Sequence, residues 1–251
     1  MELLSRSIGP LQTNVHLVAD ARTREAIAID AAIPSLPWIS GELTARGWRL
    51  ALIVSTHGHW DHTGENAALQ AWSRDVARGG ARAGPARATP AAGDGLALVA
   101  PDGRARRPDA ARGAEIAAHP ADWYRLIDPQ PLFAPFPIPA CVPAAELAEG
   151  GVIRFGEVRL DVMHTPGHTE GSVCLVSHEA GIVFSGDTLF AAGWGRVDLP
   201  GGDPAAMAES LARLATLPDG LRVLPGHGPE TTIGRERAWL EIVARERRLP
   251  L

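Results

Sequence analysis

The stretch that decides the fold reads Leu50-Ala51-Leu52-Ile53-Val54-Ser55-Thr56-His57-Gly58-His59-Trp60-Asp61-His62. The run Leu50–Ser55 is short, continuous and apolar, which is typical of a strand buried on both faces of a sheet. Imidazole and carboxylate groups follow at once, and these groups suit zinc and related divalent metals. The stretch therefore predicts a buried strand with metal ligands directly after its end.

The spacing of these ligands indicates two metal ions. Four ligands within six residues lie too close together to surround one tetrahedral ion unless the backbone turns sharply, and Gly58 permits such a turn. The simplest arrangement has His57 and His59 facing one metal, with Asp61 and His62 facing a second.

Three further short motifs each follow an apolar run. They are Thr165-Pro166-Gly167-His168-Thr169, Ser185-Gly186-Asp187-Thr188 and Pro225-Gly226-His227-Gly228. A rigid sheet can aim side chains at such positions into one cleft. The two oxygens of Asp187 can bridge two cations. Each motif alone is weak evidence, but the ordered set predicts a binuclear metal site.

The rest of the chain alternates between strand and helix patterns, and the strands fall into two groups that are each followed by a helix. We expect a turn or short helix at 122–127 and an irregular proline-rich loop at 128–143. Strands are expected at 14–20, 25–30, 50–55, 114–119, 152–155, 158–164, 172–177, 181–185 and 221–224, and helices at 37–46, 64–78, 204–216 and 234–248.

Residues 79–112 differ in composition, being rich in Ala, Gly, Pro and Arg with little apolar periodicity. We interpret them as a surface insertion, flexible or partly hairpin-like around Leu96 to Val99. An arginine-rich arm for nucleic acid is the competing interpretation, and the lack of interleaved aromatic residues disfavours it.

Length and composition limit the classes of function. The chain has 251 residues, which suits a single domain spanning 1–251, and a formal net charge of −5 with no lysine. No basic excess favours nucleic acid or an anionic membrane as a partner. No basic leader with a following apolar stretch is visible, no apolar run approaches the roughly 18 residues of a spanning helix, and two cysteines build no disulfide framework. We expect a cytoplasmic protein.

With these motifs in hand, the sequence resembles the metallo-β-lactamase superfamily, and within it the short, single-domain bacterial members of the glyoxalase II (hydroxyacylglutathione hydrolase) group. The resemblance covers nearly the whole chain apart from residues 79–112. It implies an α/β fold of the αββα sandwich type, with the metals at one edge between two sheets. It also implies that His57, His59 and His168 hold the first metal, that Asp61, His62 and His227 hold the second, and that Asp187 bridges both.

The function implied is hydrolysis of a small-molecule thioester by two divalent cations. Zinc is the expected metal, although iron and manganese accept the same His/Asp mixture. Asp61 is expected to orient the attacking water as well as to bind metal. Arg196, in Gly195-Arg196-Val197-Asp198, is a candidate to pair with a substrate carboxylate or, instead, with Asp198.

The sequence departs from the group's pattern in three places. Glu170 stands where proline is usual, Glu65 stands where glycine is common, and only residues 228–251 follow His227. The two-domain members carry a helical C-terminal domain that helps hold glutathione, so the thiol carrier of the substrate stays open. Neither glutamate occupies a ligand position.

Three other functions remain as alternatives. A persulfide dioxygenase of the same superfamily uses a single iron and shares the His57, His168 and Asp187 positions, but the seven-ligand set favours a hydrolase. A lactonase or β-lactamase-like hydrolase would act on a ring, and Asp187 counts against true β-lactamases. A metal-free binding protein would be expected to have lost ligands. The sequence leaves the oligomeric state open.

Overall fold

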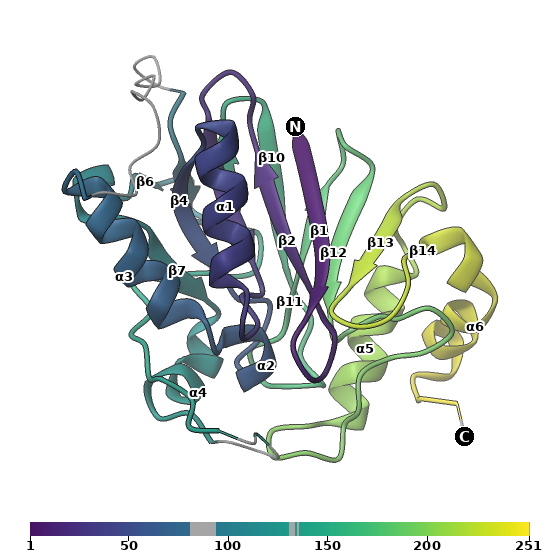
Figure 1. The fold of residues 1–251 in the computed structure, drawn as a ribbon. Helices are drawn as coiled ribbons and strands as arrows, with labels where there is room; N and C mark the ends of the chain where they lie inside the picture. The colour runs from purple at the N-terminus through teal and green to yellow at the C-terminus, as the bar shows by residue number, and fades with distance from the viewer. Residues whose placement is uncertain (81–93, 131–133, 135, 251) are drawn as a thin grey trace.

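The computed structural model describes residues 1–80, 94–130, 134 and 136–250. Within these residues the chain builds two stacked sheets with helices on both outer faces (Figure 1). The helices are α1 (Leu36–Arg46), α2 (Trp60–Thr63), α3 (Asn66–Ala77), α4 (Trp123–Ile127), α5 (Pro204–Leu214) and α6 (Ile233–Glu246), with short 3-10 turns η1 (Ala110–Arg112) and η2 (Pro120–Asp122).

The first sheet is six-stranded and the second eight-stranded in the described part of the chain. The spatial order of the first is β1 (Glu2–Ile8), β2 (Thr13–Ala19), β3 (Glu25–Ile29), β4 (Arg49–Val54), β7 (Glu115–Ala118) and β8 (Ala145–Glu146). The order of the second is β14 (Thr231–Thr232), β13 (Arg222–Pro225), β12 (Ile182–Gly186), β11 (Val173–Ser177), β10 (Val158–His164), β9 (Val152–Phe155), β5 (Ala97–Val99) and β6 (Ala105–Arg106).

Among the described residues, three apolar cores hold these four layers together. Leu52 and Val54 of β4 pack between the sheets, while Ile53 packs on the helical side with residues of α1 and α3. Helices α5 and α6 cover the outer face of the second sheet through Leu211 and Leu240, among others. The αββα sandwich expected from the resemblance is therefore confirmed.

Strand direction brings the metal-binding motifs together. Strand β4 is parallel to β3 and β7, and β12 is parallel to β13, so their carboxyl ends lie at the same edge of their sheets. The segment 57–62 follows β4, Asp187 follows β12, and His227 follows β13. An isolated bridge between Thr13 and His227 joins the two sheets at this edge.

The prediction of a single helix over 64–78 is wrong at its start. The chain forms α2 first, and then α3 begins at Asn66. The Gly64 amide closes α2 by bonding to the Trp60 carbonyl, whereas the Glu65 amide leaves the helical path and bonds to the Ala31 carbonyl. A side chain at Gly64 would meet Ile33 at 2.7 Å, so the tight packing explains why glycine stands at this position.

Strand β1 was not expected from the sequence. Its residues Glu2–Ile8 mix apolar and polar types and are largely exposed or half-buried, because β1 lies at the edge of its sheet and pairs only with β2. Of the insertion expected at 79–112, residues 81–93 lie outside the described residues. The part from Asp94 onward contains β5 and β6, an antiparallel pair that extends the second sheet from β9.

Candidate metal centre

The loop after β4 is shaped by the absence of a side chain at Gly58. A Cβ there would lie 2.8 Å from the Arg125 side chain and 3.1 Å from Asp122 Cβ. Glycine therefore lets the loop lie directly against η2 and α4. His57 and His59, on either side, are both buried.

The first ligand cluster contains His57, His59 and His168. One nitrogen of each ring lies within 4.8 Å of the others, and His59 Nδ1 is 2.8 Å from His168 Nε2. Two ring nitrogens at this separation converge on a common point. The cluster joins the loop after β4 in the first sheet to the loop after β10 in the second.

The second cluster contains Asp61, His62 and His227. The Nε2 atoms of the two histidines are 3.2 Å apart, and Asp61 Oδ2 lies 3.4 Å from His62 Nε2 and 3.1 Å from His227 Nε2. Ligands at zinc-like bond lengths on a tetrahedron are separated by about 3.4 Å. The spacing in this cluster fits such an ion.

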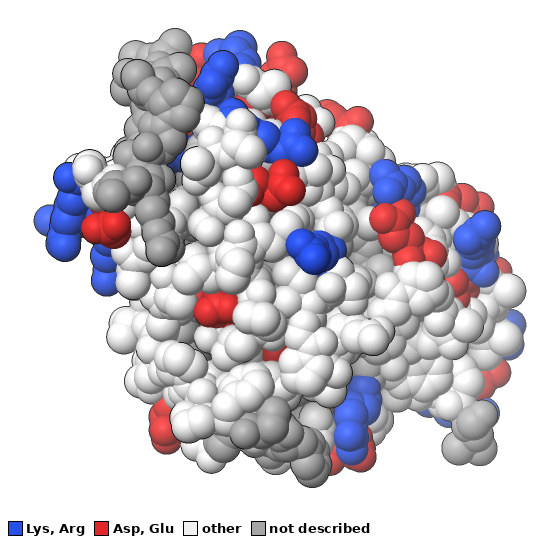
Figure 2. All heavy atoms as spheres, in the orientation of Figure 1, with Lys and Arg blue, Asp and Glu red and all other residues white. Residues whose placement is uncertain are grey.

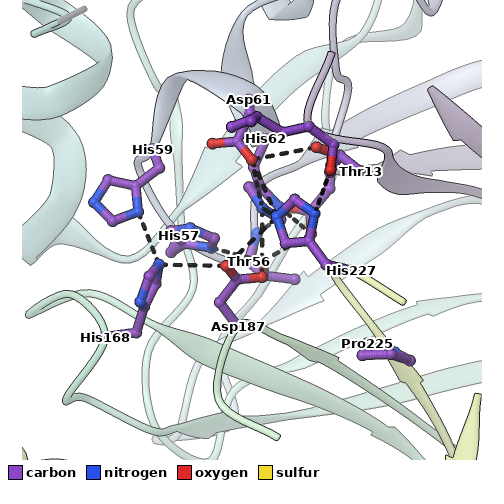
Figure 3. Close-up of polar contacts among 12 residues, drawn as sticks. Thr13, Thr56, His57, His59, Asp61, His62, His168, Asp187, Pro225 and His227 are labelled. Carbon is purple, nitrogen blue, oxygen red and sulfur yellow. Dashed lines mark hydrogen bonds and ion pairs between the residues drawn. The ribbon is translucent and has the colours of Figure 1, made fainter. Parts of the chain in front are cut away.

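Asp187 lies between the clusters (Figure 3). Its Oδ2 is 3.4 Å from His168 Nε2 and 3.6 Å from His227 Nε2, and its Oδ1 is 3.5 Å from His62 Nε2. One carboxylate thus faces nitrogens of both groups. The structure brings together all seven ligands predicted from the sequence.

Buried polar atoms in this centre fit a metal ion. Among the described residues, His57 Nε2 and Asp187 Oδ1 are buried without a hydrogen-bond partner. A buried polar atom left unpaired is costly, and a cation would supply the missing interaction. The donor set of imidazoles and carboxylates also suits zinc, iron or manganese.

The opposite nitrogen of several ligand rings is fixed by an oxygen. His168 Nδ1 donates to the Arg196 carbonyl at 2.7 Å, and His227 Nδ1 donates to the Leu11 carbonyl at 3.0 Å. His62 Nδ1 lies 3.0 Å from Asp30 Oδ2. The hydrogen bonds of His168 and His227 fix the tautomer of each ring and leave its Nε2 free to bind a metal.

Burial and charge tune the pKa values of these groups. Burial lowers the pKa of His57 well below its ordinary value and that of His59 to about 3, which keeps both rings neutral and able to bind metal. Burial alone would also lower the pKa of His62, but Asp61, Asp187 and Asp30 together raise it well above its usual range. The same concentration of negative charge favours a cation.

A cleft of about 610 Å³ opens over the ligands. Its apolar wall is made by Leu11, Trp60, Phe190 and Leu199. Arg196, the candidate substrate-binding residue, also lines the cleft. Its guanidinium lies 2.8 Å from Asp198, so the ion pair expected as the alternative is present in the structure. On the face drawn in Figure 2, acidic and basic side chains lie interspersed.

Sequence reasoning missed several residues that support the ligands. Asp30 contacts His62 and accepts hydrogen bonds from the amide and hydroxyl of Thr56, at 2.7 and 2.8 Å. Thr13 donates its hydroxyl to Asp61 Oδ2 at 3.2 Å. Asp122 is buried behind the first cluster. No local motif marks these residues, because their partners are distant in the sequence.

The two glutamates that depart from the resembled pattern have local partners. Glu170 accepts from Arg125 Nη2 at 2.6 Å, and the Tyr124 hydroxyl lies 3.3 Å away. Glu65 accepts from the Leu36 amide at 3.4 Å, at the start of α1. Both side chains therefore have structural roles in this chain.

The fold and the ligand arrangement together define a class of protein. The sequence profile of the metallo-β-lactamase superfamily matches residues 8–227, and the chain belongs to this superfamily.

The helices of the described residues include none long and apolar enough to cross a membrane.

One relative and two solved structures are similar to this chain over most of its length. The chain is 33% identical to a hydroxyacylglutathione hydrolase of Maricaulis maris over 90% of its own length and 66% of that protein. A crystal structure of TTHA1623 in a di-iron-bound form is similar at 32% identity and a TM-score of 0.68, covering 93% of this chain and 96% of that one. The BLEG-1 B3 metallo-β-lactamase matches at 26% identity and a TM-score of 0.73, covering 94% and 97%.

Proposed function

We propose that this protein is a binuclear metal-dependent thioesterase of the hydroxyacylglutathione hydrolase type. The position of Asp187 carries the proposal, because its carboxylate lies 3.4 to 3.6 Å from histidine nitrogens of both ligand clusters. The Maricaulis maris relative supports a thioester as the substrate. The superfamily assignment supports hydrolysis more generally.

The residues divide between two cations. His57, His59 and His168 would hold the first, Asp61, His62 and His227 would hold the second, and Asp187, which faces both clusters, would contribute to both. When bound, the cations lower the pKa of a shared water and polarise the substrate carbonyl. We expect zinc, and the di-iron form of TTHA1623 supports iron as the main alternative.

The chain's own groups orient the reactants. Asp61, whose Oδ2 is held by the Thr13 hydroxyl, accepts a hydrogen bond from the attacking water and orients it. Trp60 and Phe190 exclude solvent around the acyl group. The leaving thiolate needs little assistance, since a thiol pKa is about 8.5. Arg196, at the rim, pairs with a substrate carboxylate.

The decisive experiment measures thiol release from S-D-lactoylglutathione by the metal-loaded protein and by Asp187→Ala. We expect turnover by the unmodified protein and its loss in the variant, together with loss of bound metal measured by elemental analysis. Asp102→Ala is the control, because Asp102 is an exposed residue of the β5–β6 connection that pairs with Arg104. An Asp187→Ala protein with full turnover and one bound metal would refute the bridging role.

Ring hydrolysis is a second candidate, favoured by the likeness to the B3 metallo-β-lactamase. The same cleft would accept a lactone or lactam carbonyl near Asp187. Parallel assays with a thioester, a lactone and a β-lactam separate the two functions. Faster opening of a ring than release of thiol would favour this candidate.

A further inference from the structure

Asp122, at the end of η2, accepts hydrogen bonds from two separate loops. Its side chain is fully buried. Oδ2 accepts from the Gly58 amide and from the Thr169 hydroxyl, each at 2.7 Å, and Oδ1 accepts from the Gly171 amide at 2.9 Å. One carboxylate thus connects the loop after β4 to the loop after β10.

Two of the three donors are direct neighbours of first-cluster ligands, and the third, Gly171, lies three residues after His168. Gly58 stands between His57 and His59, and Thr169 directly follows His168. The ligands of the second cluster have other supports. Asp30 lies behind His62, the Leu11 carbonyl behind His227, and the Thr13 hydroxyl beside Asp61. Asp122 bonds only to residues on the loops that carry the first cluster, whereas Asp30 contacts His62 and also holds Thr56, next to His57.

The packing leaves the two loops little freedom relative to this carboxylate. A Cβ at Gly58 would lie 3.1 Å from Asp122 Cβ, and one at Gly171 would lie 2.6 Å from Asp122 Cγ. Both backbones therefore contact the Asp122 side chain directly. Arg125 Nε lies 3.5 Å from Asp122 Oδ1 and supplies a compensating positive charge.

We propose that Asp122 is a positioning residue that sets the distance between the His57–His59 loop and His168, and thereby the affinity of the first metal alone. The proposal rests on the two-metal site of the proposed function. Among the contacts described, Asp122 bonds to no ligand side chain and does not line the cleft. It therefore acts through the backbone that carries the ligands.

Asp122→Asn tests this role. An amide offers a single oxygen, so one of the two backbone amides, Gly58 or Gly171, must lose its acceptor, whereas the Thr169 hydroxyl can instead accept from the new NH2 group. We expect the affinity of the first metal to fall about 10- to 100-fold, as is typical when a group that orients a metal ligand is replaced. The affinity for the second metal should not change. Zn²⁺ titration of the metal-stripped protein against a chelating dye measures both.

Two backgrounds assign the sites. In His227→Ala, which lacks a ligand of the second cluster, the affinity that remains belongs to the first metal. In His59→Ala it belongs to the second. We expect Asp122→Asn to weaken binding in the first background and to leave binding in the second unchanged.

Asp20→Asn is the matched control for a structural carboxylate. Asp20 is also buried and accepts from two backbone amides, Thr23 at 2.7 Å and Glu157 at 3.1 Å, but it lies in the β2–β3 connection. We expect this variant to lower the melting temperature of the metal-free protein and to keep both affinities. Equal affinities in Asp122→Asn and the unmodified protein, or an equal loss at both sites, would overturn the proposal.

Thr169 provides a conservative pair. Thr169→Val removes the hydroxyl that Asp122 accepts from, while Thr169→Ser keeps it. We expect the affinity for the first metal to fall in the valine variant and to stay near that of the unmodified protein in the serine variant. A purely space-filling role of Thr169 would not produce this difference. Equal affinities for the first metal in the two variants would count against the proposal.

Failure of the proposed function is separable from failure of this inference. A single metal bound by the unmodified protein would refute the two-metal site. The role of Asp122 would then stand if Asp122→Asn still weakens that metal while Asp20→Asn does not, and it would fail otherwise.

Discussion

At the scale of single residues, the side chains that the structure brings together as candidate ligands could be named from the sequence, but the groups that support them could not. His57, His59, Asp61 and His62 lie in one short segment, so their spacing alone indicates metal binding. Asp122 is 64 residues from Gly58 in the sequence, and Asp30 is 26 residues from Thr56. Such pairs become visible only after the strands and loops have been placed in space.

Gly58→Ala should damage both stability and the metal centre. The added methyl group would lie 2.8 Å from Arg125 and 3.1 Å from Asp122, so the loop or α4 must shift. We expect a loss of about 1 to 3 kcal/mol, as for other overpacked interiors, together with weaker metal binding. Urea unfolding of the metal-free protein measures the first effect.

The control is Gly41→Ala, in the middle of α1, where no atom lies within 4 Å of the added Cβ. Alanine is the better helix former, so this variant should gain about 0.5 to 1 kcal/mol. If both variants changed stability in the same direction, crowding at Gly58 would not be the cause.

At the scale of elements, buried strands and amphipathic helices were predictable from the sequence. The apolar run 50–55 matches β4, and the pattern over 204–216 matches α5. The exceptions have local causes. Strand β1 is an edge strand whose polar residues obscure the alternation, and the α2–α3 break depends on the bond from the Glu65 amide to Ala31.

The start of α5 gives a prediction at this scale. Asp203 accepts from the Ala205 and Ala206 amides at 2.8 and 3.1 Å, and Pro204 occupies the first turn, so the cap stabilises the helix. Asp203→Ala should cost about 1 kcal/mol in urea unfolding. Asp203→Ser, which keeps a capping oxygen, should lose less. Equal losses in the two variants would argue against capping.

At the scale of the whole molecule, the space between the sheets holds a titratable group. His16 of β2 is buried and packs against Phe184 of β12, with ring centroids 5.1 Å apart. Burial lowers its pKa to about 4. An unfolded histidine has a pKa near 6.5, so below that pH the unfolded chain binds a proton that the folded chain does not.

Stability should therefore fall as the pH falls from about 6.5 toward 4. Between pH 7.5 and pH 5, His16 should contribute a loss of about 2 kcal/mol. His16→Gln removes this contribution. Urea unfolding of both metal-free proteins at the two pH values gives the difference, and an equal loss in both would show that His16 titrates normally.

Asn14, near the N-terminus, bonds to the segment 225–228 near the C-terminus, and this contact has a consequence for biosynthesis. The Asn14 amide bonds to the Gly226 carbonyl at 2.7 Å, and the Asn14 side chain to the carbonyls of Pro225 and Gly228 at 2.9 Å. Every ligand of the first cluster, and Asp187, has been synthesised before residue 188, but the second cluster waits for His227. A nascent chain therefore contains every residue of the first cluster before it contains His227, and the Asn14 contacts with residues 225–228 can form only after His227 has been added.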